Sequence, residues 1–470
     1  MLRKINVPNT QWDDMGVLPP HQLRTFLGVN GLDPFSIKEE YATSLKNLTS
    51  SGYPGLKVRS GYSRLGALLP GRIQGIGVWK DTELHAVASG TWYRWNGSSW
   101  VSLVSGLNST SPWYFCNFQG NLPQISLMAT NGIDTPRYYN GSSVTTLSNV
   151  PANASFMDQH DNRLYAAKDN KVFFSALRKP QDWTTVDEAG EINVETNNGE
   201  VINGIKAGSR HLMVFKKSSF HELWGTNPAN YQMDTIAADI GLVSNQALTM
   251  FRDSPFWVDK NNIYNYGGSR PRSDFAIPIK PYLEQMNQAQ LSKICAGNNG
   301  KCVYFSIPSA SASDPDTILE YDVDFQTWYI WKDLSILHFA GMGTDFYFGQ
   351  TDGSMNKAGG TTDNGAPISW EWISRPFGGG TLAQRQQWYR MWYVVDIPAG
   401  STMNVHLSRD AEGSNWTLVK TVSGNNLQAG RIIIPVNTVA NANWVRVKFS
   451  GTGPCEVTEF DYQQRQLPMA

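Results

Sequence analysis

Four aspartates lie close together in one stretch of the chain and are its densest group of potential catalytic or metal-binding side chains. They are Asp314, Asp316, Asp322 and Asp324. Two carboxylates about 5–10 Å apart can hydrolyse a glycosidic bond, and several carboxylates together can bind calcium. The spacing does not match a calcium-binding EF-hand loop, and Ser and Pro residues surround the acids. We therefore expect a solvated loop at this place.

A second candidate is the segment from Ser408 to Trp416, Ser-Arg-Asp-Ala-Glu-Gly-Ser-Asn-Trp. It resembles the Asp-box of sialidase-like propellers, with one extra residue and Asn in place of Thr. The resemblance implies a hairpin turn in which Asp410 accepts backbone hydrogen bonds and Trp416 packs beneath. We expect this turn to be structural, because the box is not catalytic in that family.

The histidines provide no pattern for metal binding. Asp158, His160 and Asp161 could hold an oriented base, but we expect them to serve the structure at a strand entry. No His-x-x-x-His, Gly-x-Ser-x-Gly or phosphate-binding Gly-Lys-Ser/Thr motif occurs. The sequence therefore predicts no catalytic, cofactor-binding or metal-binding residue, and we expect the protein not to be an enzyme. The seven histidines are His21, His85, His160, His211, His221, His338 and His406.

Four cysteines are too few for a disulfide framework in 470 residues. Cys295 and Cys302 flank an expected turn, so pairing between them stays open. Small buried thiols are the expectation that we favour for all four cysteines, Cys116, Cys295, Cys302 and Cys455.

Charge and hydropathy exclude several classes of protein. Charged residues make up 17% of the chain and the net charge is −1, whereas a protein that neutralises DNA carries a basic excess. Transient contact with DNA in a channel stays open. The N-terminus lacks the apolar core of a signal peptide, and no apolar run reaches the ~18 residues that span a membrane. We therefore expect synthesis in a cytosol and no membrane partner.

Short strands joined by tight turns dominate the middle of the chain. The unit Tyr/Trp-Asn-Gly-Ser-Ser occurs twice, at Asn96-Gly97 and at Asn140-Gly141, 44 residues apart. We expect two-residue hairpin turns with positive φ at both places. A repeat of this length is close to one four-stranded propeller blade. The sequence thus predicts an all-β fold with a β-propeller of about five to seven blades.

Changes in pattern divide the chain into three parts. Residues 1–55 are rich in proline and are expected to form an extended N-terminal arm, which lies on its own domain or on a neighbour. Residues 56–365 form the expected β-propeller, with one helix predicted from Pro281 to Lys293. A glycine-rich linker precedes residues 366–470, whose alternating strands predict a C-terminal β-sandwich.

Six segments follow one another between residues 55 and 365: Gly199–Ile205, Leu212–Lys217, Phe220–Pro228, Ile240–Ser244, Phe256–Tyr264 and Tyr321–Trp328. Their order resembles a known family of tailed-phage proteins, the packaged-DNA stabilisation or tail-hub (nozzle) proteins of short-tailed phages. The resemblance covers about two thirds of the chain, and it implies a ring of subunits below the portal that forms or closes the DNA conduit. It implies no catalytic residue.

Three functions stay open after the sequence has been considered. The one that we favour is a structural virion protein, a tail hub, nozzle or connector made in the host bacterial cytoplasm. Its expected partners are further copies of itself in a ring, neighbouring tail or portal/adaptor proteins, and phage DNA in transit. The alternatives are a tail-tip receptor- or glycan-binding propeller and, third, a carbohydrate-active enzyme, because propellers host all three functions.

Overall fold

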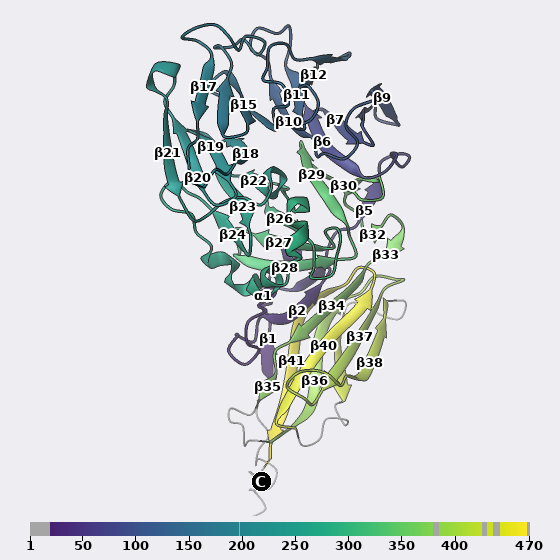
Figure 1. Ribbon diagram of the computed structural model, residues 1–470. Helices are drawn as coiled ribbons and strands as arrows, with labels where there is room; N and C mark the ends of the chain where they lie inside the picture. Colours follow the sequence, from purple (N-terminus) through teal and green to yellow (C-terminus); the bar gives the residue numbers. More distant parts are fainter. Residues whose placement is uncertain (1–18, 197, 379–384, 425–429, 436–441, 468–470) are drawn as a thin grey trace, which may run out of the picture. The chain divides into compact units, whose positions relative to one another are not determined.

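A computed structural model describes residues 19–196, 198–378, 385–424, 430–435 and 442–467 (Figure 1). The chain divides into two compact units. Residues 60–326 and 331–360 form the first, which we call the propeller unit. The segment before residue 60, residues 327–330 and the segment from residue 361 onward form the second, the sandwich unit.

Seven small antiparallel sheets, one per blade, follow one another along the described part of the propeller unit. Five of them have four strands in order along the chain, the fifth blade has three strands, and the seventh blade consists of the first four strands of a six-stranded sheet, β29-β30-β31-β5-β32-β33. The number of blades, seven, lies at the upper end of the predicted range. In blade order the strands are β6 (Ile73–Trp79), β7 (Glu83–Ala88), β8 (Thr91–Trp95), β9 (Trp100–Val104); β10 (Tyr114–Phe118), β11 (Ser126–Thr130), β12 (Arg137–Tyr139), β13 (Val144–Thr146); β14 (Phe156–His160), β15 (Arg163–Lys168), β16 (Lys171–Phe174), β17 (Gly190–Asn193); β18 (Ile202–Ala207), β19 (Leu212–Lys216), β20 (Phe220–Trp224), β21 (Gln232–Ala237); β22 (Leu248–Phe251), β23 (Ser254–Asp259), β24 (Asn262–Asn265); β25 (Cys295–Asn298), β26 (Cys302–Ile307), β27 (Thr317–Asp322), β28 (Thr327–Lys332); and β29 (Ile336–Met342), β30 (Asp345–Gln350), β31 (Met355–Ala358), β5 (Tyr62–Arg64).

The seventh blade closes the propeller by joining its two ends. Strand β5 begins the propeller unit and pairs with β31 near its end, with Ser63 opposite Lys357. The first strands of neighbouring blades pack side by side, and β6 contacts both β10 and β29. Gly77 on β6 permits this packing, because a Cβ there would lie 2.8 Å from the Phe115 ring. A closed ring of blades leaves only short sheet edges exposed.

The two Asn-Gly loops occupy the same place in consecutive blades, which supports the 44-residue repeat. The predicted two-residue turns are wrong, however, because each loop has four residues. Only the glycines take positive φ, 95° at Gly97 and 96° at Gly141. The side chain of Asn96 accepts a hydrogen bond from the backbone N of Ser99 (2.8 Å), and Asn140 makes the equivalent bond. These side-chain bonds favour the longer loop.

The helix predicted from Pro281 to Lys293 does not form as one piece. Its apolar face is as predicted, since Leu283 and Met286 are buried. Asn287 interrupts it with extended backbone, and its side chain accepts from the N–H of Ala289 (3.1 Å). The segment divides into α1 (Lys280–Glu284) and η5 (Gln288–Lys293), and η4 (Asp274–Ile279) precedes it. The other 3-10 turns are η1 (Ser50–Gly52), η2 (Pro228–Asn230) and η3 (Asn245–Ala247).

The sandwich unit consists of two six-stranded sheets to which both ends of the chain contribute. One sheet has the order β3-β4-β41-β36-β39, with β1 also on β41, and the other has the order β2-β34-β40-β37-β38, with β35 also on β40. The bounds are β1 (His21–Leu23), β2 (Ala42–Lys46), β3 (Leu48–Thr49), β4 (Leu56–Val58), β34 (Ser369–Ser374), β35 (Phe377–Gly378), β36 (Gln386–Asp396), β37 (Thr402–Ser408), β38 (Thr417–Ser423), β39 (Gly430–Pro435), β40 (Trp444–Thr452) and β41 (Glu456–Gln466), and β32 (Thr362–Asp363) pairs with β33 (Ala366–Pro367).

Aromatic side chains fill the space between these two sheets. Trp372 on β34 stacks on Phe449 of β40, with ring centroids 5.1 Å apart. Phe449 meets the edge of Phe460 from the opposite sheet at 5.6 Å. Phe26, from the N-terminal segment, is fully buried and packs edge-on against Trp372 at 5.7 Å. The N-terminal segment therefore helps to build the core of the sandwich.

The structure differs from the expected division at residues 55 and 366. The first 18 residues of the predicted arm lie outside the described residues, but residues 19–59 belong to the sandwich unit. Arg59 fastens this segment, since its side chain is 1% exposed. It donates two hydrogen bonds to Asp363 (2.8 and 2.7 Å) and one to Asn47 (3.0 Å). Pairing between strands more than 300 residues apart leaves no local pattern in the sequence.

Candidate functional site

The four aspartates singled out from the sequence do not form one site. Each has a separate structural partner, and Asp322 is fully buried rather than solvated. Asp322 accepts hydrogen bonds from the backbone N of Asp324 and of Phe325, which shape the turn after β27. Among the described residues, no three His, Cys, Asp or Glu side chains gather closely enough to hold a metal ion. The other partners are Arg72 for Asp314 (2.8 Å), Ser309 for Asp316 (2.9 Å) and Arg252 for Asp324 (2.7 Å).

Asp158 does not orient His160. Its carboxylate accepts a hydrogen bond from the backbone N of Ala207 (2.9 Å) and lies 3.3 Å from Lys206 Nζ. The negative charge of Asp158 raises the pKa of Lys206. Asp158 thus ties β14 to β18. His160 and Asp161 stand at the end of β14, not at a strand entry as predicted.

Two buried histidines stay neutral inside the blades. Trp92 donates a hydrogen bond to Nδ1 of His85 (3.0 Å), so the proton of the neutral ring sits on Nε2, 2.9 Å from Glu83. Burial lowers the pKa of His85 to about 3, and the charge of Arg94 adds to this effect. Burial also lowers the pKa of His338 to about 3. Neither ring can act as a general base near neutral pH.

The segment 408–416 has the hydrogen bonds of the expected turn. Asp410 accepts from the backbone N of Ser414 (2.9 Å) and of Asn415 (3.0 Å). These bonds hold the pKa of Asp410 well below its usual range. Arg446 donates to the carbonyl of Glu412 (2.7 Å) and so fixes the loop to β40. These contacts give Asp410 and Arg446 a structural role in this turn.

All four cysteines are buried, and none of them forms a disulfide. Cys295 and Cys302 lie on adjacent strands but not opposite one another, because Cys295 pairs in register with Ser306 and Cys302 with Asp322. Burial raises the pKa of Cys295, which leaves it as an unreactive thiol.

Cavities follow the axis around which the seven blades are arranged. A cavity of about 180 Å³ lies among the first strands of the blades. Two larger ones, of about 330 and 400 Å³, lie where these strands begin and where they end. Even pockets for small ligands measure roughly 300–1,000 Å³, so the axis of a single propeller cannot pass a nucleic acid. The central cavity is lined by Ile76, Phe115, Met157, Lys206, Leu248, Ala296 and Phe339, among others.

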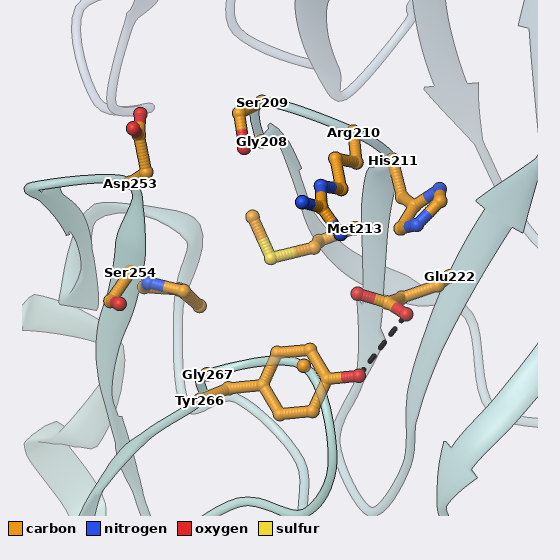
Figure 2. Close-up of a pocket in the computed structure, with 12 residues that line it drawn as sticks. Gly208, Ser209, Arg210, His211, Met213, Glu222, Asp253, Ser254, Tyr266 and Gly267 are labelled. Carbon is orange, nitrogen blue, oxygen red and sulfur yellow. Dashed lines mark hydrogen bonds between the residues drawn. The ribbon is translucent and has the colours of Figure 1, made fainter.

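A pocket of about 310 Å³ lies between the fourth and fifth blades (Figure 2). Its walls come from the β18–β19 loop at Gly208–His211, from Glu222 on β20, from the β22–β23 turn at Asp253, and from the segment that follows β24. Gly208, Ser209 and Asp253 also line the axial cavity where the first strands end. The pocket therefore borders one mouth of the propeller axis.

A buried carboxylate forms the floor of this pocket. Glu222 is 4% exposed, and its Oε2 accepts a hydrogen bond from the hydroxyl of Tyr266 (3.2 Å; Figure 2). Burial raises the pKa of Glu222, and the charge of Asp234 on the next strand adds to this effect. Burial, together with Glu222, raises the pKa of Tyr266 to about 12. The hydroxyl therefore stays protonated and donates to the carboxylate.

Arg210 and His211 stand above Glu222 in Figure 2. The Arg210 side chain is exposed and makes no hydrogen bond or ion pair with any residue that the structure describes. The His211 ring lies against the Trp224 ring at a tilt of 34°, with ring centroids 3.6 Å apart, and its buried Nδ1 has no hydrogen-bond partner among the described residues. Burial lowers the pKa of His211. Arg210 is thus the cation of the pocket that is available to a ligand.

Sequence reasoning did not single out any residue of this pocket. One local signal was present, because Glu222 places an acid inside a strand whose other residues are mostly apolar, Phe220 to Trp224. Burying an ionised carboxylate costs folding free energy unless the group is paired or hydrogen-bonded, so an acid at such a position points to a role for it. The remaining walls come from two blades, and their meeting could be known only once the blades were paired.

No family model matches the chain, and no curated protein matches its sequence. Among solved structures, the extracellular domain of a putative one-component system from B. thetaiotaomicron is similar with a TM-score of 0.45 and 8% identity, over 89% of this chain and 64% of that one. This chain therefore spans less than two thirds of that structure. YCF48 from Cyanidioschyzon merolae is similar with a TM-score of 0.43 and 7% identity, over 64% of this chain and 98% of that one. A catalytically inactive virginiamycin B lyase from Staphylococcus aureus is similar with a TM-score of 0.42 and 10% identity, over 62% of this chain and 97% of that one.

None of these likenesses carries a functional argument, because every TM-score is below 0.5 and every identity is at most 10%. Within the described residues, no helix is long and apolar enough to cross a membrane.

Proposed function

We propose that the protein is a structural component of a tailed-phage virion, a hub, nozzle or connector whose copies form a ring. The observation that carries the proposal is the way in which the chain joins its two units. It passes between them near residues 59 and 360, at the two ends of the propeller unit, and residues 327–330 also group with the sandwich unit although they belong to β28 of the sixth blade. Force on one unit is thus transmitted through two covalent connections rather than through one linker, as a load-bearing part requires.

The use of the acidic side chains supports the same proposal. Each aspartate singled out from the sequence serves a turn, an ion pair or a strand contact, as Asp322, Asp158 and Asp410 do. The cavities along the propeller axis are too small for DNA. A DNA conduit would therefore lie between subunits, where repeated rotation of one heterologous contact closes a ring.

A density map of the intact particle tests the proposal. We expect this chain in a symmetric ring around the DNA path, with subunit interfaces above about 1,000 Å². Separate copies that project from the tail tip without such interfaces would contradict it.

The N-terminal segment offers a second test. Removing residues 1–18 deletes none of the described strands. If the arm reaches a neighbouring subunit, incorporation into particles should fall while the purified protein keeps its melting temperature. A variant with residues 1–9 removed serves as a graded control. Full incorporation of the shorter protein would contradict a role of the arm in assembly.

A receptor- or glycan-binding propeller remains the second candidate, and the pocket of Figure 2 favours it. The pocket combines a buried acid, a free guanidinium and a hydroxyl, which are groups that recognise polar ligands. We do not propose an enzyme. Turnover of a glycan that is lost in Glu222→Gln would overturn that view.

A further inference from the structure

We propose that the pocket between the fourth and fifth blades binds a sugar acid, a single hydroxyl-rich ring that carries a carboxylate. This inference goes beyond the ring function and does not rest on it, because it concerns the isolated chain. The pocket volume of about 310 Å³ lies at the lower end of small-molecule sites. Such a volume suits one monosaccharide rather than a long chain of sugars.

Arg210 selects the carboxylate. A guanidinium presents parallel N–H donors that match the two oxygens of a carboxylate. Glu222 and Asp253 line the same pocket, yet neither forms an ion pair with Arg210 in the described structure. The guanidinium therefore keeps its donors for a ligand, and an anionic group is the partner that uses them best.

Glu222 selects hydroxyl groups. Its Oε2 already accepts from Tyr266, which leaves Oε1 as an acceptor facing the pocket (Figure 2). A carboxylate accepts several hydrogen bonds and donates none when it is ionised. The ligand must therefore offer donors at this end, as sugar hydroxyls do.

The charges of the pocket also orient the ligand. Asp253 stands on the wall opposite Arg210 in Figure 2, so a ligand carboxylate is repelled there and attracted at the other end. Gly267 and Gly268 form part of the remaining wall, and a Cβ at either position would meet no atom within 4 Å. These glycines leave room for the flat face of a sugar ring against the backbone.

Titration of the purified full-length chain with sodium glucuronate tests the proposal, with binding followed by NMR or calorimetry. Glucose and sodium acetate are the comparison ligands, because one lacks the carboxylate and the other lacks the hydroxyls. We expect glucuronate to bind at least about tenfold more tightly than either, the factor that one charge-assisted contact contributes. Equal binding of glucuronate and acetate would mean an anion site only and would overturn the assignment.

Two variants and a matched control complete the experiment. Arg210→Gln should weaken glucuronate binding about tenfold and leave glucose binding unchanged. Glu222→Gln keeps the acceptor for Tyr266 but weakens both sugars. The control, Arg64→Gln, removes an equal charge from β5 on the seventh blade and should bind like the wild type.

Folding does not confound this test. The Arg210 side chain is exposed and makes no hydrogen bond within the described structure, so Arg210→Gln should keep the melting temperature of the wild type. If Glu222→Gln unfolds, the glucuronate affinities of Arg210→Gln and Arg64→Gln still show whether Arg210 binds the ligand. Unchanged glucuronate affinity in Arg210→Gln would refute the proposal.

Discussion

The propeller unit and the sandwich unit use the same strands and turns but differ in how far apart their paired residues lie in the sequence. In the propeller, most strands pair with the next strand along the chain, as β10 to β13 do. In the sandwich, His21 pairs with Tyr462 and Leu45 pairs with Trp372. Local pairs leave a periodic pattern with turn residues, whereas distant pairs leave none. The stability of the sandwich therefore depends on a segment that the sequence presents as an arm.

The largest effect that we expect follows from this difference. Phe26 lies in the N-terminal segment and is fully buried against Trp372, so Phe26→Ala should destabilise the sandwich unit by about 3–5 kcal/mol. Phe215 is fully buried and stacked on Phe220 in the fourth blade. Phe215→Ala should therefore destabilise the propeller unit by a similar amount. Denaturant unfolding followed by tryptophan fluorescence and calorimetry should show each variant lowering a different transition.

Phe35 is the control for the first variant. It lies in the same segment, but it is 48% exposed, so Phe35→Ala should cost much less than Phe26→Ala. A sandwich transition that Phe26→Ala leaves unchanged would mean that the N-terminal segment is not part of this core.

The same difference explains which parts of the fold the sequence predicts. The aromatic strands around Asn96-Gly97 and Asn140-Gly141 were recognised as hairpins because both strands and the turn lie within about 15 residues. The loop length was wrong, because the side-chain bonds of Asn96 and Asn140 to the third residue after them favour four residues. The helix was predicted too long, because the capping action of Asn287 outweighs the apolar face of Leu283 and Met286.

The candidate site was harder to predict than the fold. Acidic residues that are neighbours in sequence, such as Asp322 and Asp324, attracted attention but serve separate contacts. Arg210, Glu222 and Asp253 meet in one pocket although they are neighbours neither in sequence nor within one blade. Only the packing of the fourth blade against the fifth brings them together.

The repeated loops of the first two blades allow a finer comparison within the propeller. Both glycines have positive φ, which costs an alanine about 1 kcal/mol. A Cβ at Gly97 meets no atom within 4 Å, whereas at Gly141 it would clash with Nε2 of Gln124 and lie 2.9 Å from the Trp79 ring. Trp79 is held by its bond to the carbonyl of Ile125 (2.8 Å) and cannot easily move. We expect Gly141→Ala to cost about 2–3 kcal/mol and Gly97→Ala about 1 kcal/mol, both measured by thermal unfolding.

Equal losses in the two variants would contradict this reasoning, because they would show that backbone conformation alone decides. The double variant Gly141→Ala with Trp79→Phe tests the ring contact alone, since the smaller ring removes the Trp79 atoms that the new methyl group meets while Gln124 remains.

The last effect concerns Asp259, a buried acid at the end of β23 in the fifth blade. Its Oδ1 has no hydrogen-bond partner among the described residues, and burial raises its pKa to about 6. The folded protein therefore binds a proton at this group more tightly than the unfolded chain, whose carboxyl titrates near about 3.9.

The stability that protonated Asp259 contributes is complete below about pH 4 and is lost as the pH rises to about 6. Asp259→Asn removes this dependence, so the variant should gain about 2 kcal/mol on the wild type between pH 4 and pH 7, because one pKa unit corresponds to about 1.4 kcal/mol. The gain should appear in the propeller transition alone, with the sandwich transition of the same sample as the internal reference. A pH-independent difference between the two proteins would show that Asp259 is ionised throughout this range and that its burial is offset by contacts of the charged form.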